Sequence, residues 1–184
     1  RSIVKASNDV SEKFGYTTRN ATVQTRDQTV ARLPKTIQDM IFNALRSCIV
    51  QYAESVVDLN PHPDYNEMFP GGRTFVIRYD GGKEGAMDCK PHTDCNDLLS
   101  ASVVINLSPK DGFVGGGTEF YESNPVLQAK VARPSQGQGV VFNGTKMLHG
   151  GAPVESGERY VLVALFERRF NAFHRFFGGA YLRA

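Results

Sequence analysis

The amino-acid sequence predicts an α+β domain in which one long helix packs against a β-sandwich or barrel. Three observations support this fold class. Apolar residues recur every three or four positions before residue 60, they recur every second position from residue 73 onward, and glycine pairs separate the later segments. The 184 residues amount to about one domain. We therefore expect a single domain over 1–184, with a supporting helix at about 34–57 and a β core at about 73–167.

The predicted helix begins at Pro34, because proline is favoured in the first turn of a helix. The apolar residues that follow have helical spacing and would form one buried stripe. They are Ile37, Ile41, Leu45, Cys48, Tyr52 and Val56. This pattern predicts an amphipathic helix with one face toward the rest of the domain.

The first predicted strand covers residues 73–79, where side chains alternate between two faces. Phe75, Ile77 and Tyr79 share one face of this strand. The other predicted strands are rich in β-branched and aromatic residues and are bounded by turn residues. They cover residues 102–107, 118–121, 139–143 and 159–166.

Composition and charge exclude several classes of protein. Hydrophobic residues make up 41% of the chain and charged residues 22%, so the chain can bury a core and should not be disordered. The 21 basic and 19 acidic residues give a net charge of +2, too weak to suggest electrostatic binding to nucleic acid. No apolar run approaches the roughly 18 residues of a membrane span, and the first residues contain no apolar signal-peptide core. We expect a soluble protein and leave its compartment open.

A candidate metal site is formed by His92, Asp94 and His149. His92 and Asp94 are two positions apart, so in an extended segment their side chains point to the same face. A third ligand from a distant strand would complete a facial arrangement of two imidazoles and one carboxylate. That arrangement leaves neighbouring coordination positions open and is typical of non-haem Fe(II) oxygenases.

A competing interpretation is a structural zinc site. Cys89, His92 and Cys95 have the spacing Cys-x2-His-x2-Cys, but they lack a convincing fourth ligand other than His149. With Cys48 the chain has three cysteines. This number is small and odd, so it does not indicate a disulfide framework. His-x-Asp by itself is also a short pattern that occurs by chance.

Arg159 begins an apolar strand ten residues after His149 and shares a face with Val161, Val163 and Leu165. A cation on an apolar face is costly unless it is paired. One interpretation is an arginine at a strand end that reaches solvent. The other is that its planar guanidinium binds a carboxylate through two hydrogen bonds.

Six short stretches, in order along about half of the chain, resemble the catalytic domain of 2-oxoglutarate- and Fe(II)-dependent dioxygenases of the prolyl and lysyl hydroxylase type. They are Phe75-Val-Ile-Arg-Tyr79, Pro91-His-Thr-Asp94, Val103-Val-Ile-Asn-Leu107, Gly115-Gly-Gly-Thr-Glu-Phe120, Gly139-Val-Val-Phe142 and the stretch from His149 to Phe166. Several motifs in the correct order are far more specific than His-x-Asp alone.

The resemblance implies a double-stranded β-helix, or jelly-roll, with the iron at its mouth. It implies that His92, Asp94 and His149 are the catalytic Fe(II) ligands and that Arg159 binds the distal carboxylate of the cosubstrate 2-oxoglutarate. Tyr79 and Thr118 fall where the family lines the cosubstrate pocket. The further requirements would be O2 and, as a reductant, ascorbate. The sequence departs from the family pattern at Asn106, where some relatives have a cosubstrate-binding tyrosine, and in the insert at 81–89.

The family resemblance predicts hydroxylation of an unactivated C–H bond, with succinate and CO2 released. The expected substrate is a prolyl or lysyl residue in a peptide or protein. The alternatives are a free amino acid or other small molecule as substrate, and an inactive jelly-roll binding module. A nucleic-acid demethylase is disfavoured because that group has its arginine further past the distal histidine, near Phe166. A zinc hydrolase is disfavoured because His-Glu-x-x-His is missing. Specificity is expected in loops around the mouth, at 58–72, 81–89 and 121–138.

Overall fold

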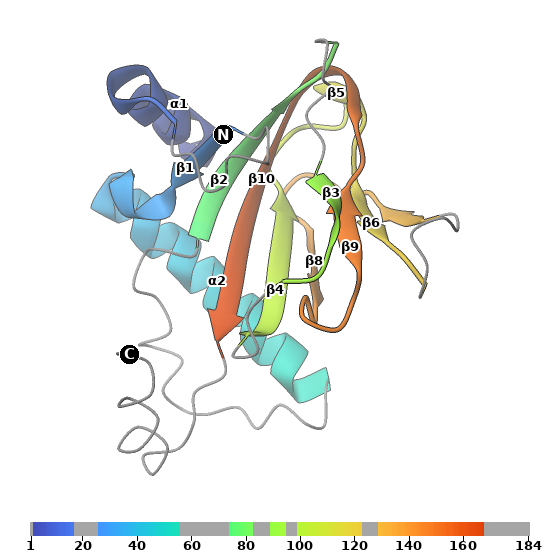
Figure 1. Cartoon of the computed structure of the whole chain (residues 1–184). Coiled ribbons are helices and arrows are strands. Elements are labelled where there is room, and N and C mark those ends of the chain that lie inside the picture. Colours follow the sequence, from blue (N-terminus) through green and yellow to red (C-terminus); the bar gives the residue numbers. More distant parts are fainter. Residues whose placement is uncertain are drawn as a thin grey trace, which may run out of the picture.

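Two antiparallel β-sheets lie face to face, and two helices cover the outer side of the larger sheet (Figure 1). The computed structural model describes residues 2–16, 26–55, 74–82, 89–94, 99–122 and 129–167. Within these residues every strand pair is antiparallel, as expected for the jelly-roll that the resemblance implies. Strands from both sheets border the same interior space.

The larger sheet has the strand order β1-β2-β10-β4-β8, and β5 pairs with the first part of β10. Its central strand, β10, is 14 residues long and pairs with β2 on one side and β4 on the other. The bounds of these strands are β1 Arg26–Thr29, β2 Thr74–Asp80, β4 Leu99–Asn106, β5 Phe113–Gly115, β8 Gly139–Phe142 and β10 Val154–Glu167.

The smaller sheet has the strand order β3-β9-β6-β7. Its strands are short, three or four residues each: β3 Cys89–His92, β6 Thr118–Phe120, β7 Lys130–Ala132 and β9 His149–Gly151. Figure 1 shows this sheet on the side of the larger sheet that is opposite α2.

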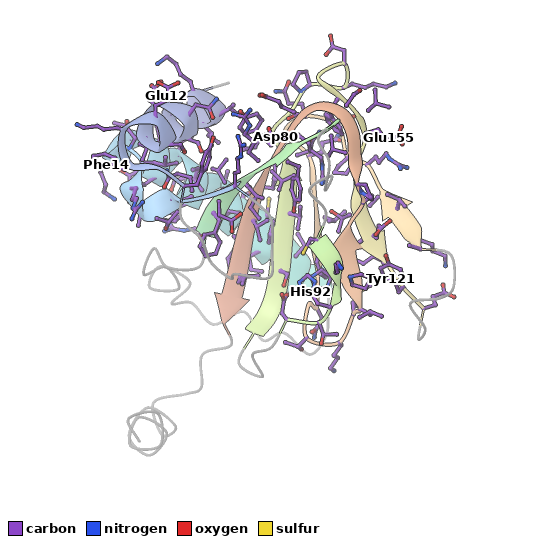
Figure 2. All side chains as sticks on the ribbon, turned by 45° about the horizontal axis from the view of Figure 1, so that its top comes forward. Glu12, Phe14, Asp80, His92, Tyr121 and Glu155 are labelled. Atoms are coloured by element: carbon purple, nitrogen blue, oxygen red, sulfur yellow. The ribbon has the colours of Figure 1, made fainter. Side chains whose placement is uncertain are left out.

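Among the described residues two α-helices lie in the N-terminal part, separated by β1, where the sequence predicted one. Helix α2 spans Lys35–Ser55 and is 21 residues long, and it follows a 3-10 helix at Val30–Arg32. Residues 56 and 57 lie outside the described residues. Helix α1, Ser2–Phe14, was not predicted because polar residues outnumber its apolar ones, although Ile3, Val4 and Val10 pack against the core. Its buried positions are Ala6, Ser7 and Ser11, and Glu12 and Phe14 lie on its outer surface (Figure 2).

The core has two parts, one on each face of the larger sheet. On the outer face, Ile41, Leu45 and Ile49 of α2 pack into the same cluster as residues of β2, β4 and β10. The predicted stripe position Ile37 packs at the margin of this cluster. On the inner face, a second cluster forms around the predicted row Phe75, Ile77 and Tyr79, together with Val154 and Val161. The period-two prediction for this strand is therefore confirmed.

All five predicted strands are present, with bounds shifted by a few residues. In the part of the chain that the structure describes there are five further strands of three or four residues each, namely β1, β3, β5, β7 and β9. Strands this short do not repeat often enough to give a period-two signal. No helix among the described residues is both long and apolar enough to cross a membrane.

Candidate active site

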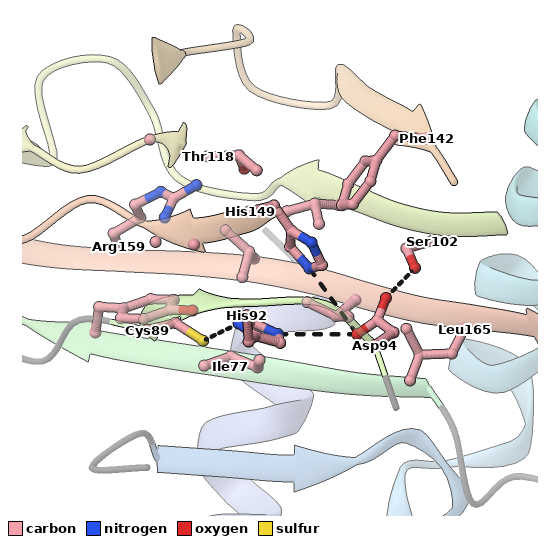
Figure 3. Close-up of a pocket in the computed structure, with 17 residues that line it drawn as sticks. Ile77, Cys89, His92, Asp94, Ser102, Thr118, Phe142, His149, Arg159 and Leu165 are labelled. Atoms are coloured by element: carbon pink, nitrogen blue, oxygen red, sulfur yellow. Dashed lines mark hydrogen bonds and ion pairs between the residues drawn. The ribbon is translucent and has the colours of Figure 1, made fainter. Parts of the chain in front are cut away.

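A cavity of about 110 Å³ lies between the two sheets, and the predicted site residues border it (Figure 3). A single water molecule needs roughly 10–15 Å³ of cavity volume measured in this way, so this cavity is large enough for a small organic ligand. The larger sheet contributes one wall: Ile77, Tyr79, Ser102, Val104, Phe142, Arg159, Val161, Val163 and Leu165. The smaller sheet and adjoining residues contribute the other: Cys89, His92, Asp94, Gly117, Thr118, His149, Gly150 and Gly151.

Strand pairing brings the two predicted histidines together. His92 ends β3 and His149 begins β9, and these two residues are direct partners in the antiparallel register. Their ring centroids are 4.4 Å apart. Asp94 follows two residues after His92, and one potential ligand atom from each of the three residues lies within 4.8 Å of the others. His92 and Asp94 therefore face the same side, as their spacing of two residues predicted.

Both imidazoles present Nε2 to the same oxygen of Asp94. The distances to Asp94 Oδ1 are 3.8 Å from His92 and 3.9 Å from His149. The other nitrogen of each ring is used by the backbone: Nδ1 of His92 lies 2.8 Å from the carbonyl oxygen of Lys90, and Nδ1 of His149 lies 2.8 Å from that of Met147. An N–H on Nδ1 donating to a carbonyl leaves the Nε2 lone pair free for a metal ion. The donor set fits a ferrous ion.

The electrostatics of the two histidines differ. Burial is the largest effect on His149, and it lowers the pKa of that imidazole. The side chain of Cys89, whose Sγ is 3.7 Å from Nδ1 of His92, is the largest of the influences that raise the pKa of His92 to about 9. The His92 side chain is also 42% exposed, against 9% for His149. The cluster is therefore reached from solvent on the His92 side.

Asp94 is held by two residues that the sequence did not point to, Ser102 at its carboxylate and Gly144 at its backbone. Ser102 Oγ donates a hydrogen bond of 2.5 Å to Oδ2. The backbone N–H of Asp94 donates to the carbonyl oxygen of Gly144 at 2.9 Å, and a Cβ on Gly144 would overlap both Oδ2 and the Ser102 hydroxyl. Alternation along the predicted strand at 102–107 could place Ser102 on the cavity face. Its contact with Asp94 depends on chain packing and has no sequence signal.

The predicted cosubstrate residues lie at the other end of the cavity. Arg159 is 3% exposed, and it makes no hydrogen bond or ion pair with any other described residue. It is paired with Tyr79 across β10 and β2, and its guanidinium carbon lies 5.5 Å from the centre of the Tyr79 ring. Thr118 on β6 is buried and borders the same space. Burial is the main cause that lowers the pKa of Arg159, and the nearby charge of Arg133 acts in the same direction.

The structure also bears on two further features of the sequence, the unusual residue Asn106 and the alternative zinc site. Asn106 follows Ser102 and Val104 on the same face of β4, but its amide donates to the carbonyl oxygens of Ser108 and Pro134 and does not border the cavity. Asn106 therefore ties the end of β4 to a loop. In the zinc alternative, Cys89 lies beside Nδ1 of His92, on the side of the ring away from Asp94, and Cys95 lies outside the described residues.

Comparison with known proteins agrees with this geometry. The model of the 2OG-Fe(II) oxygenase superfamily matches residues 49–167, well over half of the chain. That match covers β2 through β10 and hence all six predicted site residues. No curated protein matches the sequence.

Several solved structures share the fold at low identity. A prolyl-4-hydroxylase from Pseudomonas putida superposes with a TM-score of 0.65 at 17% identity, covering 92% of this chain and 86% of that one. A prolyl hydroxylase from Trichoplax adhaerens, in complex with a peptide fragment of the hypoxia inducible factor oxygen degradation domain, gives 0.60 at 13% identity, covering 90% and 76%. A viral collagen prolyl hydroxylase from Paramecium Bursaria Chlorella virus-1, in complex with 2OG, gives 0.55 at 17% identity, covering 91% and 89%.

The structural likenesses, all below 25% identity, concern the fold. The family match concerns the sequence itself and spans both sheets. On that match, this chain belongs to the 2OG-Fe(II) oxygenase superfamily and is a 2-oxoglutarate-dependent dioxygenase.

Proposed function

We propose that this protein hydroxylates a prolyl or lysyl residue of a peptide or protein, using one Fe(II) held by His92, Asp94 and His149 and one 2-oxoglutarate anchored by Arg159. When bound, the ferrous ion supplies the oxidising chemistry, in which O2 is reduced, 2-oxoglutarate is converted to succinate and CO2, and C–H becomes C–OH. Ascorbate would serve as a reductant that keeps the iron ferrous. The protein's own residues bind and orient the reactants and exclude water.

The observation that carries this proposal is that Arg159 is buried without an anionic partner among the described residues. A guanidinium this deeply buried is costly unless an anion neutralises it, and none of the described residues does so. Its cavity has room for a small organic ligand, and the opposite end of that cavity carries the His-Asp-His cluster. A dicarboxylate that reaches from Arg159 to a metal ion would satisfy both ends.

Neighbouring side chains would refine the binding of the cosubstrate. The Tyr79 ring, stacked near the guanidinium, contributes a cation–π attraction that keeps Arg159 oriented before the anion arrives. Tyr79 and Thr118 border the same cavity, and their hydroxyl groups would donate hydrogen bonds to the distal carboxylate. Val161 and Val163, beside Arg159 on β10, make the cavity wall apolar and limit access of water.

A peptide substrate is supported by two features. The exposed side of His92 leaves the cluster open to a large partner, whereas His149 is enclosed. Among the proteins of similar fold, one was solved with a peptide fragment bound, and prolyl hydroxylases recur. The choice between prolyl and lysyl residues would be made by the loops around the mouth.

The test is a product assay with the whole chain. The protein, Fe(II), 2-oxoglutarate, ascorbate and O2 are incubated with proline- and lysine-containing peptides and with free proline and lysine. Mass spectrometry then follows the gain of one oxygen atom together with succinate. A peptide product formed in step with succinate supports the proposal. Product from free amino acids alone would overturn the peptide assignment, and 2-oxoglutarate binding without any succinate would indicate an inactive binding module.

A further inference from the structure

The two carboxylate oxygens of Asp94 have different partners. Oδ1 faces Nε2 of both histidines, at 3.8 and 3.9 Å. Oδ2 points away from them and accepts the hydrogen bond of 2.5 Å from Ser102 Oγ (Figure 3). Ser102 is 2% exposed, so water does not compete for its hydroxyl. A hydrogen bond to an ionised acceptor in such a place is among the stronger ones in a protein.

The surroundings of Oδ2 leave it little freedom. Ser102 is held in the middle of the larger sheet, paired with Phe142 on β8 and Leu165 on β10. Gly144 closes the other side, since any side chain there would overlap both Oδ2 and Ser102 Oγ. The backbone bond from the Asp94 N–H to the Gly144 carbonyl fixes the main chain of Asp94 as well. The carboxylate therefore cannot easily rotate to turn both oxygens toward the histidines.

We propose that Ser102 is a positioning residue that restricts Asp94 to metal binding through Oδ1 alone. This inference rests on the Fe(II) site proposed above. An ion that took one atom from each of the three residues would keep neighbouring positions open. Bound 2-oxoglutarate and O2 would need those positions. A carboxylate that used both oxygens would occupy one of them and compete directly with the cosubstrate.

A purely structural role for Ser102 makes a different prediction. If the hydroxyl only filled space in β4, its removal would lower thermal stability and metal affinity together. If the hydroxyl keeps Oδ2 away from the metal, its removal acts mainly on the later binding of 2-oxoglutarate. The metal still binds, but 2-oxoglutarate must then displace Oδ2 before it can chelate. The ratio between the two affinities separates these roles.

The experiment compares the parent protein with Ser102→Ala, which removes the hydroxyl, and Ser102→Thr, which retains it. Ser11→Ala is the matched control, because Ser11 is another buried serine with a hydrogen-bonded hydroxyl, on α1 and away from the cavity. Fe(II) is titrated into each protein without O2. Then 2-oxoglutarate is titrated into the Fe(II)-loaded protein, and the visible charge-transfer band of the chelate is followed. Thermal unfolding of the metal-free proteins is measured in parallel.

For Ser102→Ala we expect 2-oxoglutarate affinity to fall by about tenfold or more, and by a larger factor than Fe(II) affinity, within the 10–100-fold range typical of groups that support metal ligands. Ser102→Thr should restore it to within about threefold of the parent, and Ser11→Ala should leave it unchanged. Unchanged 2-oxoglutarate affinity in Ser102→Ala would overturn the inference. The inference would also be overturned if Ser102→Ala lowered the Fe(II) and 2-oxoglutarate affinities equally and Ser102→Thr did not restore them.

Two controls keep the result decisive. If Ser102→Ala does not fold, Ser102→Cys takes its place under the same criteria, because a thiol is of similar size and only a weak donor. If the parent gives no band with Fe(II) and 2-oxoglutarate, the proposed cosubstrate site itself fails, and this inference with it. A parent band that Ser102→Ala reproduces with equal affinity overturns the inference alone.

Discussion

At the scale of single residues, the site depends on a cation whose charge no described side chain balances. Arg159→Ala removes that cation, and a carboxylate brought into the cavity would then stay unpaired, at a cost of about 3–5 kcal/mol. At about 1.4 kcal/mol per tenfold change, the 2-oxoglutarate requirement should rise by roughly two to three orders of magnitude. The measurement is the apparent 2-oxoglutarate affinity, with the iron content of each sample as the check that the metal site is intact.

Two milder variants should weaken 2-oxoglutarate binding by smaller factors. Arg159→Lys keeps the charge and loses the planar fork, so its affinity should be intermediate. Tyr79→Phe retains the ring that faces the guanidinium and loses a hydroxyl worth about 1 kcal/mol, so it should weaken 2-oxoglutarate binding less than tenfold. An Arg159→Ala protein that binds 2-oxoglutarate as well as the parent would contradict the assignment of this residue.

The metal ligands can be tested against the zinc alternative, also at the residue scale. Asp94→Ala removes the single carboxylate of the cluster and should abolish both iron binding and turnover. Cys89→Ser should leave the iron content unchanged, since Sγ lies beside Nδ1 of His92 rather than beside the Nε2 atoms that converge on Asp94. Metal analysis of the purified variants decides the matter. Loss of metal in Cys89→Ser with retention in Asp94→Ala would favour zinc.

At the scale of secondary-structure elements, the site depends on how closely β3 and β9 approach. A Cβ on Gly150 would lie 2.7 Å from the carbonyl oxygen of Cys89 on β3. Gly150→Ala should therefore push apart the strands that carry His92 and His149, and it should lower iron affinity more than tenfold, as a change in ligand geometry typically does. Iron titration and thermal unfolding would be measured together.

The control for this variant is Gly137→Ala, in an exposed turn with open space around the position. Its positive φ of +82° makes alanine costly there, so it tests the general effect of glycine replacement. Some stability should be lost and iron affinity should stay the same. Equal iron affinities in the two variants would show that the approach of β3 to β9 does not matter for the metal.

At the scale of the whole molecule, Tyr160 joins β10 to the N-terminal helix. Its side chain is largely buried, and its hydroxyl donates to Asn8 on α1 at 3.2 Å. Burial is the main cause that raises the pKa of Tyr160 above the ordinary value of 10.0. A raised pKa in the folded state means that the neutral phenol stabilises the fold below pH 10, and that this contribution is lost as the pH rises through the folded pKa.

Comparison with Tyr160→Phe isolates this contribution. At neutral pH the variant should be less stable by about 1 kcal/mol, because the hydrogen bond of the hydroxyl is lost. Above pH 10 the difference should shrink or reverse, since phenylalanine cannot ionise. Urea unfolding at neutral pH and above pH 10 measures both differences. A difference independent of pH would mean that Tyr160 does not titrate in the folded protein.

Much of the architecture could be predicted because it rests on local patterns. Alternation along β2 identified the inner row Phe75, Ile77 and Tyr79, and alternation along β10 put Arg159 on the same face as Val161, which is how both lie in the cavity. Helix α1 was not predicted because polar residues outnumber its apolar ones, although Ile3, Val4 and Val10 pack against the core. The short strands escaped prediction because three or four residues carry too little periodicity.

The sequence by itself determined the chemistry that is available to this protein: which donor groups are present, which neighbours along a strand share a face, and which family their order indicates. Only the tertiary structure decided which distant groups meet. His92 lies opposite His149 because of the register between β3 and β9, and Ser102 and Gly144 reach Asp94 Oδ2 because the two sheets pack together. The physical reason is that a side chain's direction follows from local backbone geometry, whereas strand register follows from the packing of the whole core.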